Sequence, residues 1–391
     1  MKRAGFTGDI WPDETQELLL RSALLPGAAG AAAWFAVRPR IDIDYLPGEL
    51  HRLIPLLSKA LASQGVNDPD LPRLKGVFQF SWYRNQRLFA DGATLLGAFE
   101  TAGVRTMLLR GAAMATAYHG DVGARPMNDL DVLLPADVLD KGRRIAEAGG
   151  WSRYAESRTL EQREAATILR NHEGRLARLH WSPSRNVPMP VGSEHPIWTR
   201  ATQIQFGNTA TCVLSSADHL VYACLDGARA NSGSTLRWIT DATILLRSAP
   251  DLDWEVVVEQ ARRHRVSLLI AEALRYLADV FGADIPSGPI EALSTTPTTA
   301  RDRIAHRLSL RTSPGLPSAA ELLGRFIRLT ADLPPPAAVG AMPAFLQTTL
   351  GVPRRRDVPI AIARKAIQAV ASPARPIVEL SKAGPPGSGR N

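Results

Sequence analysis

The chain is poor in cysteine and contains no long hydrophobic run. Its two cysteines, Cys212 and Cys224, make neither a disulfide scaffold nor a CxxC zinc motif, and they fit a reducing compartment. No window approaches 18 uncharged apolar residues, so no membrane-spanning helix is expected. The first residues lack a continuous apolar stretch behind their basic side chains, so no secretory signal is expected either. These absences predict a cytoplasmic protein.

Motifs of several common enzyme classes are also missing. The sequence contains no Walker A motif and no GxSxG motif, which argues against a P-loop kinase and a serine hydrolase. No pair of histidines has metal-ligand spacing, so a zinc site is not expected. Arginine far outnumbers lysine, but no arginine-rich run resembles a nucleic-acid module. Sequence-specific nucleic-acid binding is therefore not predicted.

The net charge of +8 is concentrated at the C-terminal end. Residues 301–391 contain 14 Lys/Arg and 5 Asp/Glu, a net charge of +9, so the rest of the chain is nearly neutral. The simplest interpretation is a solvated or disordered basic tail. The alternative is a docking segment for an acidic partner, a carrier or leader peptide, or anionic lipid.

Hydrophobic periodicity predicts four regions. Residues 1–103 are expected to be helical, 104–212 to form an αβ core, 213–290 to form a helical domain, and 291–391 to form a basic, helical or partly disordered extension. Within the core, apolar runs at 105–109, 130–134 and 176–181 predict strands, and 156–171 reads as a charged helix. The expected fold class is α+β, with a small mixed sheet flanked by N-terminal and C-terminal helical regions.

Four Asp-x-Asp triplets occur in the sequence, and only one of them opens a predicted strand. Alternation along that strand places the carboxylates of Asp129 and Asp131 on the same side. The preceding predicted strand ends at Arg110-Gly111, where glycine permits a tight turn and the following helix N-terminus offers N–H groups to a phosphate. Adjacent carboxylates repel unless a cation lies between them, and Mg²⁺ suits carboxylate and phosphate oxygens.

Such a constellation is suited to two-metal, in-line nucleotidyl transfer. The structural alternative is that the two aspartates act as caps or ion-pair partners, for example of Arg125.

The stretch LLRGAAMATAYHGDVGARPMNDLDVLL, from Leu108 to Leu134, resembles the uncharacterised nucleotidyltransferase family of the DNA-polymerase-β-like superfamily. The resemblance extends to Arg84-Asn85, 179–181 and 236–241, and it covers roughly residues 15–285. The positions that match the family pattern are Gly111, Tyr118, Arg125, Pro126, Asp129 and Asp131.

The resemblance implies a minimal nucleotidyltransferase αβ core with an NTP as substrate. It also implies Mg²⁺ at Asp129 and Asp131. The phosphates would lie at the turn formed by Arg110, Gly111 and Ala112, and Arg125 would face the phosphates or anchor the aspartate loop. The NMP acceptor would be a hydroxyl or phosphate of a small molecule or peptide. Because members commonly accompany biosynthetic genes, a role in natural-product biosynthesis is implied.

The sequence departs from the family pattern at the expected third carboxylate, where Arg178 stands. Either Glu173 supplies the acid from the preceding loop, or His180 acts as the base. Two non-catalytic hypotheses stay open beside these. One is a nucleotide-binding or regulatory protein that has lost catalysis, and the second is a peptide-binding partner that docks through its tail.

Two further aspartates each have more than one interpretation. Asp226 reads as an ordinary polar helix residue at a position where relatives carry histidine. Asp241 either forms a helix-surface ion pair with Arg237 at i,i+4 or contacts the acceptor pocket.

Overall fold

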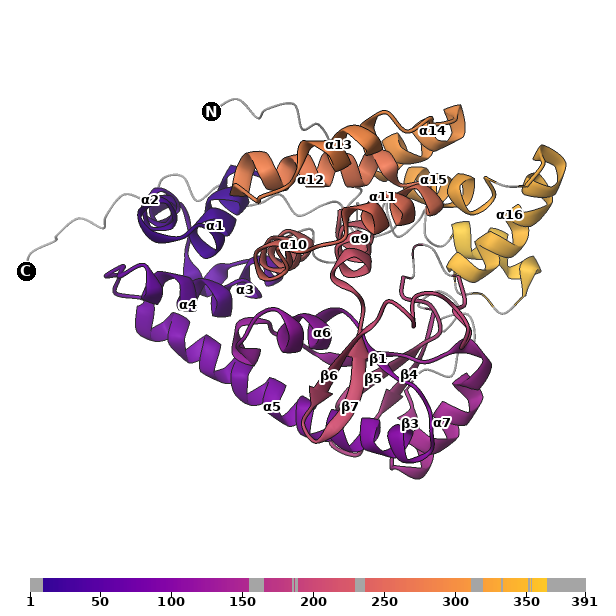
Figure 1. Ribbon diagram of the computed structural model, residues 1–391, viewed down its shortest axis with the longest axis horizontal. Helices are drawn as coiled ribbons and strands as arrows, with labels where there is room; N and C mark the ends of the chain where they lie inside the picture. Colours follow the sequence, from indigo (N-terminus) through magenta and orange to yellow (C-terminus); the bar gives the residue numbers. More distant parts are fainter. Residues whose placement is uncertain are drawn as a thin grey trace, which may run out of the picture.

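The protein combines a mixed sheet with many helices and is α+β, as the sequence predicts (Figure 1). The computed structural model describes residues 10–154, 165–184, 186, 189–228, 236–310, 319–331, 333–350, 352 and 354–363. The described strands are β1 (Met107–Leu108), β2 (Asp129–Leu133), β3 (Ser152–Arg153), β4 (Ala166–Arg170), β5 (Leu176–His180), β6 (Thr202–Phe206) and β7 (Thr209–Val213).

The helices precede, interrupt and follow the strands along the chain. They are α1 (Glu14–Leu24), α2 (Gly27–Val37), α3 (Gly48–His51), α4 (Ile54–Ser63), α5 (Leu71–Thr101), α6 (Arg110–Ala117), α7 (Leu139–Ala148), α9 (Ser216–Gly227), α10 (Arg237–Ser248), α11 (Trp254–Arg263), α12 (Ser267–Phe281), α13 (Ser287–Ser294), α14 (Ala300–Ser309), α15 (Ala319–Leu329) and α16 (Pro335–Leu350). Within the described ranges, no helix has both the length and the apolarity needed to cross a bilayer.

The strand order in the described sheet is β3-β4-β5-β2-β1-β7-β6. β1 pairs antiparallel with β2 and parallel with β7, and β2 pairs parallel with β5. The register of the β2–β5 pair aligns Asp131 with Arg178. The strands predicted at 105–109, 130–134 and 176–181 are confirmed as β1, β2 and β5.

The expected helix at 156–171 is wrong for residues 166–170, which form β4, an antiparallel partner of β5. Residues 155–164 lie outside the described part of the chain. A tight turn explains the strand, because the side chain of Asn171 accepts the N–H groups of Glu173 and Arg175 and folds the chain back on itself. The edge hairpin β6–β7 was also not expected from the sequence.

The two faces of the sheet bury different hydrophobic clusters. Leu130 and Val132 point to one face, where they pack with Leu96 and Phe99 of α5. On the other face, Leu133 joins the cluster of the helical layer. Because side chains alternate along β2, its aspartates must point toward the helical layer and away from α5.

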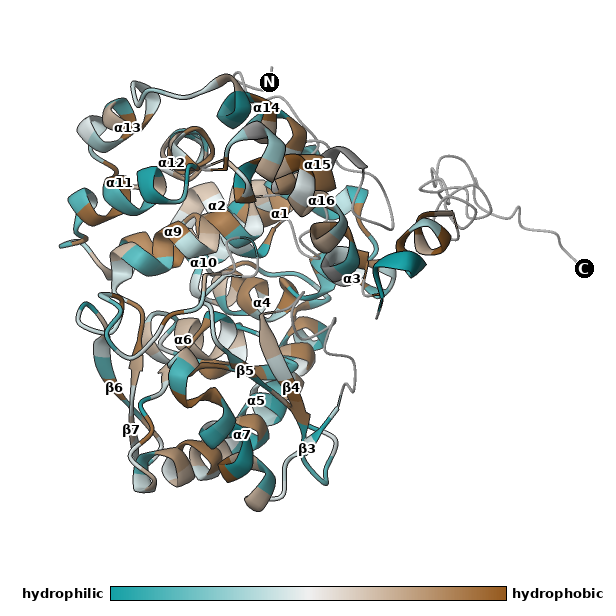
Figure 2. Ribbon diagram, turned by 90° about the vertical axis from the view of Figure 1, so that its right-hand side faces the viewer, coloured by the Kyte–Doolittle hydropathy of each residue, from teal (hydrophilic) through white to brown (hydrophobic). Residues whose placement is uncertain are grey.

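The helical layer combines the N-terminal helices with α9–α12, which lie far apart in the sequence (Figure 2). Trp11 packs against Trp238 and Tyr276, with ring centroids 6.1 and 4.8 Å apart. Trp238 is therefore held in the core of the helical layer and also lines the cavity described below. This layer covers the aspartate face of the sheet and leaves a cavity between the two.

The C-terminal extension is described only in part. In the basic extension expected at 291–391, residues 358–363 are helical, and residues from 364 onward lie outside the described part of the chain.

Candidate active site

The predicted pair of aspartates lies at the beginning of β2, on the face that meets the helical layer. Asp131 is buried, with 9% of its side chain exposed, and Asp129 is half-buried at 24%. Both line a cavity of about 360 Å³, together with residues of α6, α9 and α10. Cavities of this size between structural layers are typical of small-molecule sites.

The structure brings most of the predicted site residues to this cavity. Arg110, Gly111 and Arg125 line it together with the two aspartates. Ala112 is buried in the sheet core instead, and His180 lies behind Asp131 with only 1% exposure. Glu173 lies in the turn between β4 and β5, where it pairs with Arg87 and Arg175 at the surface.

A third acid beside the carboxylates of Asp129 and Asp131 would complete a metal-binding group. Across the described part of the chain, no group of three His, Cys, Asp or Glu side chains is placed to hold a metal ion. The position expected for an acid carries a cation, because Nε of Arg178 donates to Oδ2 of Asp129 at 2.7 Å. Glu173 therefore does not lie where it could supply the third carboxylate that the sequence suggested.

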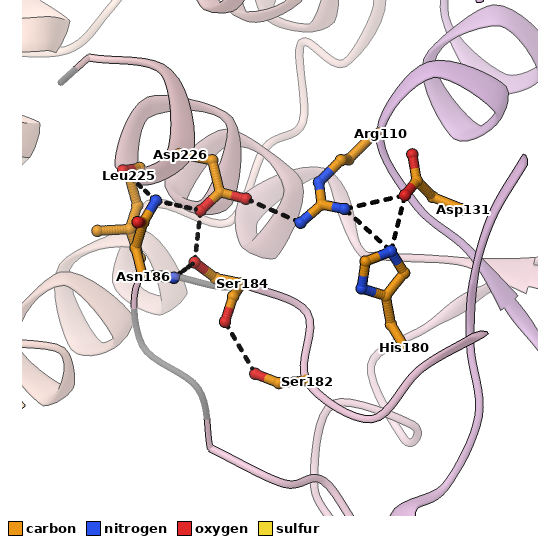
Figure 3. Close-up of polar contacts among 8 residues, drawn as sticks. All are labelled: Arg110, Asp131, His180, Ser182, Ser184, Asn186, Leu225 and Asp226. Carbon is orange, nitrogen blue, oxygen red and sulfur yellow. Dashed lines mark hydrogen bonds and ion pairs between the residues drawn. The ribbon is translucent and has the colours of Figure 1, made fainter. Parts of the chain in front are cut away.

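Arg110 lies between two carboxylates from different elements (Figure 3). Its Nη1 donates to Oδ1 of Asp131 at 2.9 Å, and its Nη2 is 3.5 Å from Oδ2 of Asp226 on α9. Asp226 accepts hydrogen bonds from the hydroxyl of Ser184 at 2.5 Å and the amide of Asn186 at 2.8 Å. Asp226 thus anchors Arg110 in the cavity, a contact that its position in a predicted helix did not reveal.

His180 holds Asp131 from the other side. Nε2 of His180 lies 2.7 Å from Oδ1 of Asp131 and 3.0 Å from Nη1 of Arg110 (Figure 3). Because a carboxylate only accepts hydrogen bonds, the bond to Asp131 requires the tautomer of His180 that carries its proton on Nε2. Nδ1 of His180 is buried and has no hydrogen-bond partner in the described part of the chain. This geometry makes His180 a positioning residue for Asp131, and its ring does not line the cavity.

The charges of this cluster set its protonation states. Burial raises the pKa of Asp131, but the charge of Arg110 and the hydrogen bond from His180 outweigh burial and hold that pKa well below its usual range. Burial and the negative charge of Asp131 raise the pKa of Asp129. Burial and the charge of Arg110 lower the pKa of His180, which favours its neutral form. Asp131 is therefore the firmly ionised carboxylate of the two.

Arg125 anchors the loop that leads to the aspartates. Its Nε and Nη2 atoms donate to the two carboxylate oxygens of Asp241, both at 2.7 Å, in a buried bidentate pair. Asn85 of α5 holds the same loop, donating to the carbonyl of Arg125 at 2.9 Å and accepting the N–H of Met127 at 3.2 Å. This geometry supports the anchoring role for Arg125. It also replaces the expected surface ion pair between Asp241 and Arg237.

The bend before α6 depends on two neighbouring residues. Arg110, not Gly111, adopts the left-handed backbone conformation, with φ of 50°. Gly111 is needed for packing, because a Cβ atom there would lie 2.8 Å from Cγ of Met127. The prediction that Gly111 permits a close approach is thus correct, but the left-handed φ belongs to Arg110.

The mixed α+β core, with an Asp-x-Asp pair on a strand beside a helix N-terminus, agrees with the class that the family match shows, the nucleotidyltransferases. Residues 48–282, more than half of the chain, match the family described as "Uncharacterised nucleotidyltransferase", and the chain belongs to this family. No curated protein matches the chain significantly.

Two solved structures are distantly similar to the chain. One is the antibiotic-resistance factor ANT(2'')-Ia, with 15% identity, a TM-score of 0.34, and coverage of 49% of this chain and 99% of that one. The other is an antigenic nucleotidyltransferase-like protein from Paracoccidioides brasiliensis, with 16% identity, a TM-score of 0.36, and coverage of 53% and 94%, respectively. Similarity at this level does not identify the substrate of this chain.

Proposed function

We propose that this nucleotidyltransferase moves an NMP from an NTP to a hydroxyl or phosphate of a small molecule or peptide, with Mg²⁺ held by Asp129 and Asp131. The observation that carries the proposal is the projection of both carboxylates from β2 into one cavity, beside the bend that begins α6. We further propose that the protein acts in the cytoplasm, in the biosynthesis of a small molecule or modified peptide.

The donor set fits one Mg²⁺. This ion is usually bound by one or two carboxylates together with substrate phosphates. Burial and the charge of Asp131 raise the pKa of Asp129, and a cation between the two carboxylates would relieve their repulsion. Bound there, Mg²⁺ would withdraw charge from the phosphate oxygens of the NTP. Arg110 and Arg178 already hold the carboxylates, so a metal has to compete with them.

The chain's own residues orient the reactants and balance their charge. His180 and Arg110 fix the carboxylate of Asp131, and Arg125 with Asp241 holds the approach to β2. The guanidinium of Arg110 and the N–H groups at the start of α6 provide positive charge for phosphate oxygens. Pyrophosphate is the leaving group when an NMP is transferred.

A second candidate function is nucleotide binding without transfer. The ion pair between Arg178 and Asp129 favours it, because this cation stands where the superfamily pattern requires an acid. Among the described residues, no other acid completes the set. In this second function the same cavity binds the nucleotide, but no group deprotonates an acceptor.

The test measures Mg·NTP binding by calorimetry and pyrophosphate release for the four NTPs, with a panel of metabolites and peptides as acceptors. We expect Asp131→Asn and Asp129→Asn to weaken metal-dependent NTP binding at least about tenfold and to abolish release. Asp140→Asn, whose side chain on α7 is 74% exposed, is the matched control and should behave as wild type.

Unchanged metal-dependent binding and turnover in both asparagine variants of β2 would contradict the metal assignment. Tight Mg·NTP binding without pyrophosphate release, across the acceptor panel, would favour the second candidate.

A further inference from the structure

The cavity contains more cationic side chains than its own carboxylates can balance. Five arginines and four aspartates line it. Three of the arginines form ion pairs with all four carboxylates. Arg110 contacts both Asp131 and Asp226, Arg125 contacts Asp241, and Arg178 contacts Asp129. Two arginines, Arg52 and Arg237, remain.

Arg237 is the first residue of α10, and its guanidinium is partly enclosed by the protein. Its Nη2 is buried and finds no hydrogen-bond partner among the described residues. Asp241, one helical turn further along, gives both of its carboxylate oxygens to Arg125, so Asp241 and Asp129 offset the charge of Arg237 only at longer range. Burial lowers the pKa of Arg237 to about 10, and the nearby charges of Arg125 and Arg52 contribute to this shift.

Arg52 reaches the same place from the N-terminal helices. It follows α3, lines the main cavity with Arg237, and also shares with Arg237 a small adjoining cavity of about 30 Å³. In the part of the chain that the structure describes, its side chain has no hydrogen-bond or ion-pair partner. Two helical segments that are distant in the sequence therefore bring two guanidinium groups without an ion-pair partner among the described residues, Arg237 largely enclosed and Arg52 exposed, to one wall of the cavity.

A buried cation without a hydrogen-bond partner, here Arg237, is costly, and a ligand anion offsets this cost, while the exposed Arg52 adds a second charge that the anion can reach. The planar donor fork of a guanidinium matches the oxygens of phosphate, and the five arginines and four aspartates leave the lining with a net positive charge that attracts such an anion. We propose that Arg237 and Arg52 form a binding site for a substrate phosphate, on the helical side of the cavity and separate from the metal-binding carboxylates. The inference rests on the proposed function only for the source of this phosphate, which is either the pyrophosphate end of the NTP or a phosphorylated acceptor.

The experiment titrates the full-length protein with inorganic phosphate and with inorganic pyrophosphate, in EDTA, by calorimetry. We expect both Arg237→Gln and Arg52→Gln to weaken pyrophosphate binding at least about tenfold, since each removes a charge-assisted pair. Arg237→Lys should retain part of the affinity, because lysine keeps the charge without the fork. Arg144→Gln, which removes an arginine of α7 outside the cavity, should bind as wild type.

Thermal unfolding provides a second measurement on the same proteins. An anion that binds the native state raises the unfolding temperature of the wild-type protein. Arg237→Gln should fold, because it removes a charge that has no partner among the described residues, but pyrophosphate should no longer stabilise it. Equal binding of both anions by the wild-type protein and Arg237→Gln overturns the inference, as does the absence of binding by the wild-type protein at millimolar concentration.

Two further titrations identify the source of the phosphate. If Arg237→Gln weakens Mg·NTP binding in parallel with pyrophosphate binding, the site holds the nucleotide. If Mg·NTP affinity is unchanged, and nucleotide-loaded wild-type protein still binds phosphate through Arg237, the site holds the acceptor. The titrations in EDTA require neither metal nor turnover. If anion binding depends on Arg237 but no NTP gives pyrophosphate release, the phosphate site stands and only the proposed transfer reaction is contradicted.

Discussion

The Nε atom of Arg178 on β5 lies 2.7 Å from Oδ2 of Asp129 on the neighbouring strand β2. Both side chains are partly exposed, at 26% and 24%, so water and ligands reach the pair. An ion pair of this exposure stabilises a protein by roughly 1 kcal/mol at most. For the proposed metal site, Arg178 would therefore be a modest competitor of a divalent ion with an attached triphosphate.

Replacing Arg178 by glutamine should strengthen Mg²⁺ binding in the presence of NTP by about three- to tenfold. The substitution removes both the competing ion pair with Asp129 and the repulsion between the guanidinium and the metal. Calorimetry with Mg²⁺, or paramagnetic resonance with Mn²⁺, measures the effect. Arg175→Gln is the control, because Arg175 pairs with Asp91 and Glu173 at the start of the same strand. Weaker metal binding in Arg178→Gln would mean that Arg178 contributes to holding the substrate.

The backbone conformation of Arg110 predicts an unusual order of stability among its variants. At a φ of 50°, an L side chain costs roughly 1 kcal/mol that glycine avoids. Arg110→Gly and Arg110→Ala lose the same contacts with Asp131 and Asp226, so their difference isolates the backbone. We expect Arg110→Gly to be about 1 kcal/mol more stable than Arg110→Ala in urea unfolding, opposite to the order in an ordinary helix. The reverse order would refute the strained bend.

The buried pair of Arg125 and Asp241 should behave as a unit. Removing one partner by Arg125→Met or Asp241→Asn leaves a buried charge or an unsatisfied donor, and each should destabilise the protein by about 3–5 kcal/mol. The double variant Arg125→Met/Asp241→Asn should lose clearly less than the sum of the two. Chemical unfolding of the four proteins closes this double-mutant cycle. Additive losses would show that the two side chains do not depend on each other.

His264 should make the protein less stable in acid. Burial lowers its pKa to about 4 in the folded protein, where it hydrogen-bonds the hydroxyl of Tyr222 at 3.2 Å. As pH falls from about 6.5 to about 4, the unfolded chain binds a proton that the folded protein does not, so stability declines through this window. The loss amounts to about 2 kcal/mol between pH 7 and pH 5.

His264→Gln should reduce that decline, measured as the free energy of unfolding in urea at the two pH values. His172 is exposed in the β4–β5 turn, so His172→Gln is the matched control and should retain the wild-type slope. If the free energy of unfolding of His264→Gln declines with pH as steeply as that of the wild-type protein, other groups cause the acid sensitivity.

Local patterns predicted the elements whose signals lie within a few residues. The alternation in DLDVLL correctly placed β2 and put Asp129 and Asp131 on one face, since successive side chains point to opposite sides of a strand. The strand β4 was missed because its sequence, ATILR, is short and follows a charged stretch. Only its pairing with β5 makes these residues a strand. Pairing of this kind is a tertiary property and leaves no periodic signal.

By itself, the sequence determined the class of the core, the carboxylate pair and the bend beside it, because these depend on alternation, turn chemistry and a contiguous motif. Only the tertiary structure decided which charges neutralise one another. Arg125 is 116 residues from Asp241, and Arg110 is equally far from Asp226. Such partners meet only when α9 and α10 pack over the sheet, and the same packing leaves Nη2 of Arg237 without a hydrogen-bond partner among the described residues. Ion pairing depends on distance in space, which the spacing of residues along the chain does not encode.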